Sequence, residues 1–263
     1  DQAAQDRQRA QRQASESQRQ QEAHTKAAQR ARQLWDAASE AGTADHGYVR
    51  NKGVRPTGVR VGADGWLLVP VRDGAGELWN VQRIASETPS DGGPGKLFLR
   101  GGRKTGLWCM LGSPAGANVM VLCEGWATGA SLHEATGYPV AVAFDAGNLV
   151  GVAKAMRALY PAARLVLAAD DDRGTADRTG KNPGRDKATG AARAVRGVVA
   201  LPAPLPDGGS DFNDLHQAAG LDAVRACVES ASAAGQAKAQ RQAAEGGRRD
   251  PFSVTDAGVY YTG

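Results

Sequence analysis

Two short stretches decide the fold of this chain: VMVLCEG at residues 119–125 and RLVLAADDD at residues 164–172. Each is an apolar run that ends in carboxylates. A run without alternation between apolar and polar residues predicts a strand buried on both faces, as in a parallel sheet covered by helices. Ligand sites of open α/β sheets lie at the carboxyl ends of the strands, so the acids at these ends mark the expected site.

The segments around these strands alternate between helix and strand patterns. In chain order they are a strand at 119–123, a helix at 127–136, a strand at 139–144, a helix at 149–159, a strand at 164–169, a polar loop, a helix at 187–195, a strand at 198–201 and a last helix at 218–232. Apolar strands joined by helices predict a parallel sheet flanked by helices. We therefore expect an α/β domain over residues 116–232.

Residues 43–115 have a different pattern, in which short apolar runs alternate with glycine turns. The runs lie at 58–61, 66–71, 78–84, 97–99 and 107–110. Turns such as Asp64-Gly65 between such runs are typical of β-hairpins. The segment therefore predicts a small, basic, antiparallel β-rich subdomain ahead of the α/β domain.

The two ends of the chain differ from its middle. Residues 1–42 predict a long helical extension, because they hold no proline and no glycine before Gly42. An apolar face begins at Ala27, and Trp35 is its expected anchor on a core. Residues 233–263 predict a linker, rich in Ala, Gln, Gly and Arg, and then the start of a truncated following domain.

Charge is distributed unevenly. The 263 residues carry 32 Lys and Arg against 28 Asp and Glu, a net charge of +4. Residues 50–104 hold ten basic and five acidic side chains, whereas residues 116–217 hold ten basic and eleven acidic. A basic surface suits phosphates and clustered carboxylates suit a divalent metal. The alternative is that both clusters are solvated faces.

Composition excludes several classes of protein. An aromatic content of 5% argues against a broad base-stacking platform. No apolar run approaches the ~18 residues of a membrane helix, and the polar start predicts no secretory signal. Cys109, Cys123 and Cys227 are far apart, which argues against a zinc ribbon or a disulfide framework. We expect a protein without membrane contact in a reducing, cytoplasmic compartment.

Three acids are expected to converge at the ends of the strands. Asp170 and Asp172 face the same way along extended chain, whereas Asp171 faces the other way and is expected to be structural. Glu124 ends the other apolar strand. Three carboxylates repel one another unless a cation is present, and Mg²⁺ or Mn²⁺ takes oxygen ligands while keeping waters for substrate phosphates.

Further candidates surround these acids, each with a structural alternative. Asp211 is a fourth candidate carboxylate or the N-cap of the next helix. Asp145 and Asn148 are candidate substrate contacts or an Asx-turn. Basic side chains in two glycine-containing loops are candidate contacts for template or nucleotide phosphates. They are Arg100, Arg103 and Lys104 in the first loop, and Lys181, Arg185 and Lys187 in the second. The alternative for the second loop is that it is only an exposed, mobile segment.

Several motifs make the chain resemble a known family. They are EGWATGAS at 124–131, VAFDAGNL at 142–149, AADDD at 168–172, GKNPG at 180–184 and DFNDL at 211–215. Together they resemble the Toprim domain, and more closely the bacterial-type Toprim primases of plasmids and integrative elements. The segments HGY at 46–48, KGV at 52–54 and GGRKTG at 101–106 resemble the part that these primases carry upstream. The stretch after Asp250 resembles the opening of a helicase-related module.

The resemblance implies a nucleotidyltransferase. It implies a metal-dependent DNA primase core that makes short RNA from NTPs on single-stranded DNA, with a helicase domain or another replication protein as partner. Glu124, Asp170 and Asp172 would then be the catalytic and metal-binding residues, with Asp211 as a further ligand. Two alternatives stay open: a Toprim-type nuclease, and a non-catalytic module that binds nucleic acid or a helicase.

Overall fold

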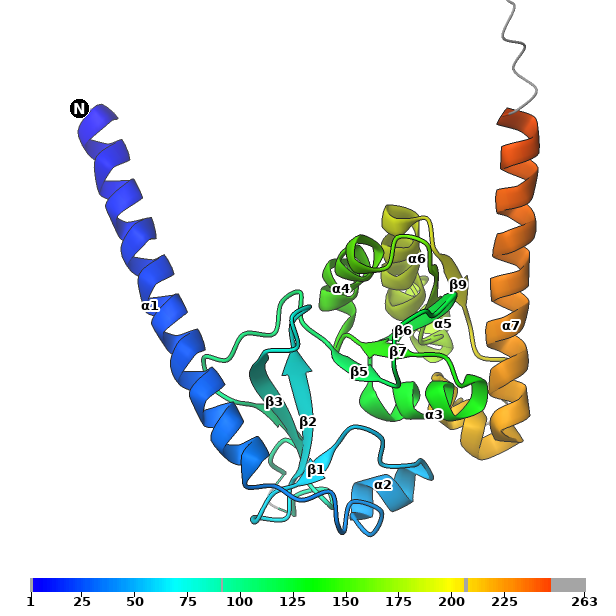
Figure 1. Cartoon of the computed structure of the whole chain (residues 1–263), viewed down its shortest axis with the longest axis horizontal. Helices are drawn as coiled ribbons and strands as arrows, with labels where there is room; N and C mark the ends of the chain where they lie inside the picture. The colour runs from blue at the N-terminus through cyan, green and yellow to red at the C-terminus, as the bar shows by residue number, and fades with distance from the viewer. Residues whose placement is uncertain (1, 91, 206–207, 247–263) are drawn as a thin grey trace, which may run out of the picture.

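The computed structural model describes residues 2–90, 92–205 and 208–246. Figure 1 shows two sheets side by side, with one long helix against the first sheet and a group of helices around the second. This arrangement confirms the expected α/β fold with a small β-rich unit and a long helix before it. The predicted start of a following domain lies in residues 247–263, outside the described residues.

The first unit is an antiparallel sheet in the order β1-β2-β3-β4. Its elements are β1 (Arg60–Val61), β2 (Leu67–Arg72), β3 (Leu78–Ile84) and β4 (Lys96–Phe98), preceded by the short helix α2 (Gly47–Lys52). Neighbouring strands pair antiparallel throughout. The glycine turns therefore act as predicted: they connect consecutive strands as hairpins.

Helix α1 (Gln2–Asp36) lies along β3 only with its last third. Ala27, Ala28 and Ala31 are buried there, and the guanidinium of Arg60 lies 4.7 Å from the ring centroid of Trp35. The described residues up to Glu22 are exposed, and Figure 1 shows this part projecting from the body. The apolar face that starts at Ala27 thus marks where the helix packs.

The second sheet has the order β5-β7-β6-β8-β9. It contains β5 (Cys109–Leu111), β6 (Val119–Cys123), β7 (Val140–Val142), β8 (Arg164–Ala168) and β9 (Val198–Ala200). All pairs are parallel except β5 with β7. Every residue of β6 is buried, as its apolar run predicts.

The expectation for residues 107–110 was wrong in one respect. We expected this run in the antiparallel unit, but the strand at 109–111 is the antiparallel edge of the second sheet. An apolar run shows that a strand exists but not which distant strand it pairs with. Instead, Trp108 links the two sheets: its backbone and that of Arg72 exchange hydrogen bonds of 2.8 and 3.1 Å.

Helices cover both faces of the second sheet. Helices α3 (Trp126–Thr136) and α7 (Phe212–Gly246) pack on one face. Helices α4 (Ala146–Leu159) and α6 (Pro183–Val195) pack on the other. Among the described residues, no helix is long and apolar enough to cross a membrane.

Two helical segments differ from the prediction. Where we expected a polar loop, α5 (Arg173–Thr179) and the first turn of α6 form, and the side chain of Asn182 caps α6 by accepting from the backbone N–H of Arg185. The last helix begins at Phe212, kinks at Gly220 and runs to Gly246 through the expected linker. Ala and Gln favour helix once a preceding helix supplies the nucleus.

Candidate functional site

The carboxylates of Glu124 and Asp170 meet at the ends of two adjacent strands. Glu124 directly follows β6 and Asp170 lies just past β8, its parallel neighbour. Glu124 Oε1 and Asp170 Oδ1 are buried and accept no hydrogen bond from the described residues. A buried carboxylate oxygen without a donor is costly, and such groups mark places where a cation or substrate binds.

The pKa values of both carboxyl groups are raised by their surroundings. Burial raises the pKa of Asp170 to about 7, and the charges of Glu124, Asp211, Asp172 and Asp214 add to the effect. Burial also raises the pKa of Glu124, with a further contribution from the charge of Asp172. The acids at this edge of the sheet therefore disfavour one another's charged form, and no described basic side chain lowers the pKa of Glu124 or Asp170.

The start of α6 closes on the same acids. The backbone N–H of Gly184 donates to Asp172 Oδ2 at 3.1 Å. A Cβ atom at position 184 would lie 2.7 Å from the carbonyl oxygen of Asp170 and 3.2 Å from Asp172 Oδ2. Only glycine allows this approach, which holds Asp172 beside Asp170.

These residues fit a hard divalent cation without forming a finished binding site. Their donor atoms are carboxylate oxygens, the kind that Mg²⁺ and Mn²⁺ prefer, and two of these oxygens accept no hydrogen bond from the part of the chain that the structure describes. In the described part of the chain, no three His, Cys, Asp or Glu side chains stand close enough to form a ready-made metal site. The cation would thus complete the arrangement together with water and substrate oxygens.

Asp211 acts as a helix cap. Its Oδ1 accepts from the backbone N–H groups of Asn213 at 2.7 Å and Asp214 at 2.9 Å, at the start of α7. The capping alternative is therefore the one that the structure shows, while the charge of Asp211 still reaches Asp170.

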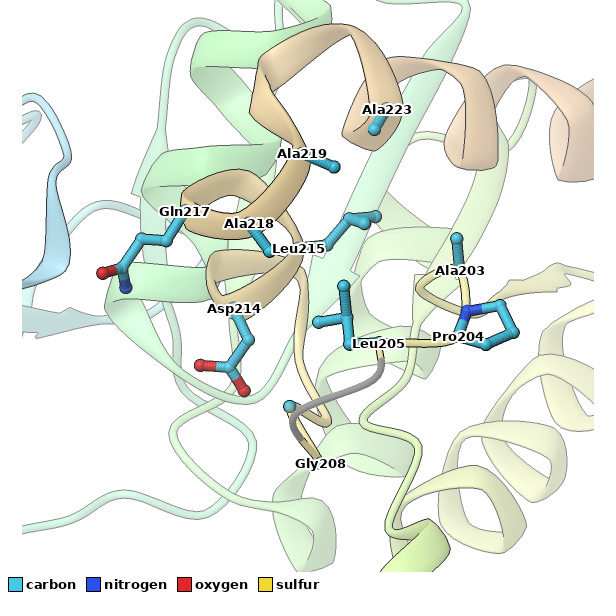
Figure 2. A pocket seen from close by; sticks show the side chains of 11 residues that line it. Ala203, Pro204, Leu205, Gly208, Asp214, Leu215, Gln217, Ala218, Ala219 and Ala223 are labelled. Carbon is cyan, nitrogen blue, oxygen red and sulfur yellow. The ribbon is translucent and has the colours of Figure 1, made fainter.

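Asp214 is a neighbour that sequence reasoning missed. Its carboxylate accepts from the backbone N–H of Ser210 at 2.9 Å, and its charge also contributes to the raised pKa of Asp170. Figure 2 shows Asp214 at the edge of an otherwise mostly apolar hollow of about 800 Å³ beside Leu205 and Leu215. The signal was available in the DFND run at 211–214, where two acids lie three residues apart.

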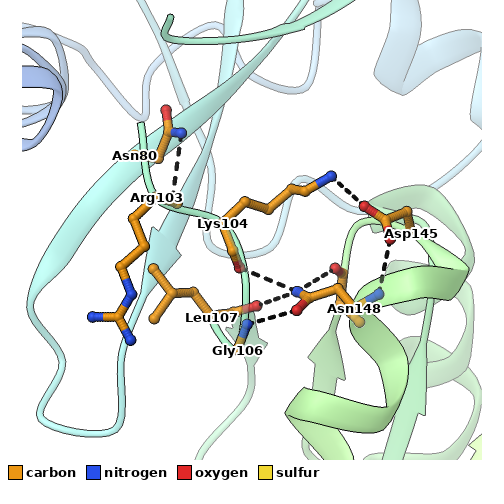
Figure 3. A network of polar contacts seen from close by, with 8 residues as sticks. Asn80, Arg103, Lys104, Gly106, Leu107, Asp145 and Asn148 are labelled. Carbon is orange, nitrogen blue, oxygen red and sulfur yellow. Dashed lines mark hydrogen bonds and ion pairs between the residues drawn. The ribbon is translucent and has the colours of Figure 1, made fainter. Parts of the chain in front are cut away.

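Asp145 and Asn148 join the two sheets. Asp145 forms the Asx-turn that caps α4, since it accepts from the backbone N–H of Asn148 at 2.9 Å, and it makes an ion pair with Lys104 (Figure 3). Asn148 is buried, and its amide donates to the carbonyls of Leu107 and Ala143, both at 2.9 Å. Its oxygen accepts from the backbone N–H of Gly106 at 2.6 Å, so all its polar atoms are used within the chain.

The first basic loop is partly engaged. Lys104 Nζ lies 5.3 Å from the ring centroid of Phe98 as well as beside Asp145. The Arg103 guanidinium lies 5.0 Å from the ring centroid of Trp79. Arg100 is exposed. Arg100 of this loop is therefore accessible to solvent, whereas Arg103 and Lys104 lie against aromatic rings.

The second basic group is open to solvent. Lys181, Arg185 and Lys187 are exposed around the start of α6. Their helix contacts Asp172 through Gly184, so they lie at the same end of the sheet as the acids. Asp171, by contrast, is buried and bound by Arg173 and Asn182, in keeping with its expected structural role.

Comparison with known proteins identifies the class of this domain. Residues 119–222 match the sequence model of the Toprim domain family. This part of the chain is a Toprim domain, as the motifs predict.

The chain is also homologous to particular primases. Two proteins from Escherichia coli, each named DNA primase TraC, are 36% and 37% identical to it over 164 residues, or 60% of this chain. The match spans only 11% and 15% of the length of those two relatives. The homology therefore concerns one segment of much longer proteins.

Solved structures share the fold. A DnaG primase catalytic domain bound to ssDNA matches with a TM-score of 0.53 at 15% identity, over 86% of this chain and 84% of that one. The primase domain of the bacteriophage T7 gp4 protein, in a complex with the lagging-strand DNA polymerase, matches with a TM-score of 0.50 at 19% identity, over 68% and 88%. At these identities the likeness concerns the fold alone.

Proposed function

We propose that this chain is the catalytic core of a DNA primase, a nucleotidyltransferase that makes short RNA from NTPs on single-stranded DNA. The observation that carries the proposal is the pair of buried carboxylate oxygens on Glu124 and Asp170, at adjacent strand ends, that accept no hydrogen bond from the described residues. The homology to the TraC primases gives this pair its chemical context.

Each group has a role that follows from its position. Glu124, Asp170 and Asp172 hold Mg²⁺ or Mn²⁺, with Asp211 facing them from the start of α7. The cation, when bound, neutralises charge on the triphosphate and on the reacting oxygens. The exposed side chains of Lys181, Arg185 and Lys187 contact the triphosphate.

The two sheets divide the work in this proposal. The β-rich unit of residues 43–115 guides the template through Arg100, Arg103 and Lys104, and the Toprim domain of residues 116–232 carries out the chemistry. A helicase domain or another replication protein is the partner that supplies single-stranded template. Binding of the isolated chain to a replicative helicase, measured by analytical ultracentrifugation, tests this last point.

The activity is tested by incubating the chain with NTPs, a single-stranded DNA template and Mg²⁺ or Mn²⁺, and following labelled primer on a gel. We expect primer from the wild type and none from Glu124→Gln, which keeps the shape of the side chain and removes its charge. Lys154→Gln, an exposed change on α4, is the matched control. Equal synthesis by wild type and Glu124→Gln contradicts the assignment, and metal-dependent cutting of DNA without primer favours a Toprim nuclease instead.

A further inference from the structure

A small cavity of about 180 Å³ lies between α2 and the end of the β3–β4 hairpin. Its lining combines the aromatic ring of Tyr48, the amide of Asn51, the hydroxyls of Ser86 and Thr88, and the ammonium of Lys96. This is a mixture of one flat ring, one cation and several small hydrogen-bonding groups. None of these residues is one of the proposed metal-binding acids Glu124, Asp170 and Asp172.

The register of the sheet places Lys96 on the cavity side. Lys96 pairs with Ile84 across β3 and β4, so both side chains lie on the same face of the sheet, and Ile84 is buried there. Lys96 Nζ lies 5.0 Å from the ring centroid of Tyr48, which is half-buried. Because Lys96 is exposed on a long flexible stem, its ammonium can exchange the ring for a phosphate.

The cavity is fixed in position relative to the acids. The ring of Tyr48 lies 6.3 Å from that of Trp126, the first residue of α3, which follows Glu124 and Gly125. On its other side, α2 is fixed to the hairpin: the backbone N–H of Gly47 donates to Ser86 Oγ at 2.9 Å, and a Cβ on Gly47 would lie 2.5 Å from the carbonyl oxygen of Ser86. One ring of the cavity lining thus contacts the helix that follows Glu124.

We propose that this cavity binds a single nucleobase together with its phosphate, with the base stacked on Tyr48 and the phosphate on Lys96. Base–aromatic stacking tolerates any base, and a lysine ammonium acts as a point charge for phosphate. The volume lies below the ~300–1,000 Å³ of sites for drug-sized ligands, which suits one base inside the cavity and leaves the sugar and phosphate outside, at the exposed Lys96. The exposed carboxylate of Glu87 in the same lining disfavours phosphate beside it, so the phosphate contact falls to Lys96.

The inference rests on the proposed function, because a primase core handles such groups from two sources: a template nucleotide and a free NTP. The test measures binding of the full chain without metal, so catalysis plays no part. The probes are a fluorescein-labelled single-stranded oligonucleotide and, separately, ATP followed by calorimetry. The variants are Tyr48→Leu, which keeps bulk but removes the ring, Tyr48→Phe, which restores it, and Lys96→Gln.

We expect Tyr48→Leu to weaken binding about fivefold or more, Tyr48→Phe to bind as the wild type does, and Lys96→Gln to weaken binding and lower its salt dependence. Leu97→Ala, on the opposite face of β4, and Lys154→Gln are matched controls that leave binding unchanged. Weaker oligonucleotide binding alone assigns the cavity to the template, and weaker ATP binding assigns it to the incoming nucleotide.

Unchanged affinity for both probes in Tyr48→Leu and Lys96→Gln overturns the proposal, provided that the thermal transitions match the wild type. If Tyr48→Leu fails to fold, the exposed Lys96→Gln variant decides alone. A wild-type chain that binds through Tyr48 but makes no primer with metal refutes the proposed function and leaves the cavity assignment supported.

Discussion

Replacing Asn148 is expected to loosen the junction between the two sheets. The residue is 5% exposed, and its side-chain amide bonds to the carbonyls of Leu107 and Ala143 and to the backbone N–H of Gly106. Asn148→Ala leaves two buried carbonyls and one N–H without this partner. At about 1–3 kcal/mol for each unsatisfied buried group, and with water reaching the more open ones, the free energy of unfolding falls by about 2–5 kcal/mol.

Urea unfolding and thermal melting test this prediction, through the size of the loss in stability and through the ranking of two variants. At roughly 3 °C per kcal/mol for a chain of this size, Asn148→Ala lowers the melting temperature by about 5–15 °C. Asn148→Asp is expected to cost more, because it turns a buried negative charge toward the carbonyls of Leu107 and Ala143. Asn118→Ala changes an exposed asparagine and serves as control. Values for both Asn148 variants within about 0.5 kcal/mol of the wild type refute the reasoning.

Four further predictions concern Asp170, Gly184 and His46. In EDTA, Asp170→Asn raises the melting temperature at pH 7: the pKa of this carboxyl is raised from 3.8 to about 7 in the folded chain, so stability is lost as the pH rises through that window. The same variant loses the stabilisation that Mn²⁺ gives the wild type in a thermal shift assay, and equal shifts in both would exclude Asp170 as a ligand. Gly184→Ala, which brings a Cβ to 2.7 Å from the Asp170 carbonyl oxygen, costs about 1–3 kcal/mol, whereas Gly190→Ala in an open position of the same helix costs nothing. Burial lowers the pKa of His46, against the opposing effect of a hydrogen bond that the protonated ring donates to the backbone of Gly65. Stability is therefore full above about pH 6.5 and falls below it. His46→Gln flattens this acid side of the profile, and an unchanged profile contradicts the assignment.

Local pattern was enough to predict the central strands and their chemistry. The runs at 119–123 and 164–168 are buried on both faces, so their apolar character alone identifies them. The parallel direction that follows from this burial also puts Glu124 and Asp170 at the same edge. The antiparallel hairpins were predictable for a similar reason, because their turns are local.

Pairing and capping at a distance were not predictable. The strand at 109–111 joins β7 through contacts with residues about thirty positions away, and nothing in its own sequence distinguishes this from another hairpin. We expected Asn148 either to contact substrate or to form a turn. Its hydrogen bond to the carbonyl of Leu107 instead depends on a loop some forty residues earlier in the chain. The position of a polar side chain after a strand shows that it is near the site, whereas its partners decide whether it contacts substrate or holds the scaffold.

Most basic side chains of residues 50–104 have a partner within the chain, so the positive charge of this segment is a poor measure of its affinity for nucleic acid. Seven of the ten side chains lie against an acid, a carbonyl or an aromatic ring: Arg55, Arg60, Arg72, Arg83, Lys96, Arg103 and Lys104. A guanidinium held between an indole and a carboxylate is already compensated, so the net charge of the segment overstates its attraction for phosphate. Three of the ten, Arg50, Lys52 and Arg100, make no such contact with the described residues, and the exposed Lys96 can exchange its ring for a phosphate. Phosphate binding by this unit should therefore depend on these few side chains rather than on its total charge. The salt slope of oligonucleotide binding should correspond to about four phosphate contacts or fewer, well below the ten that a simple count of basic residues implies.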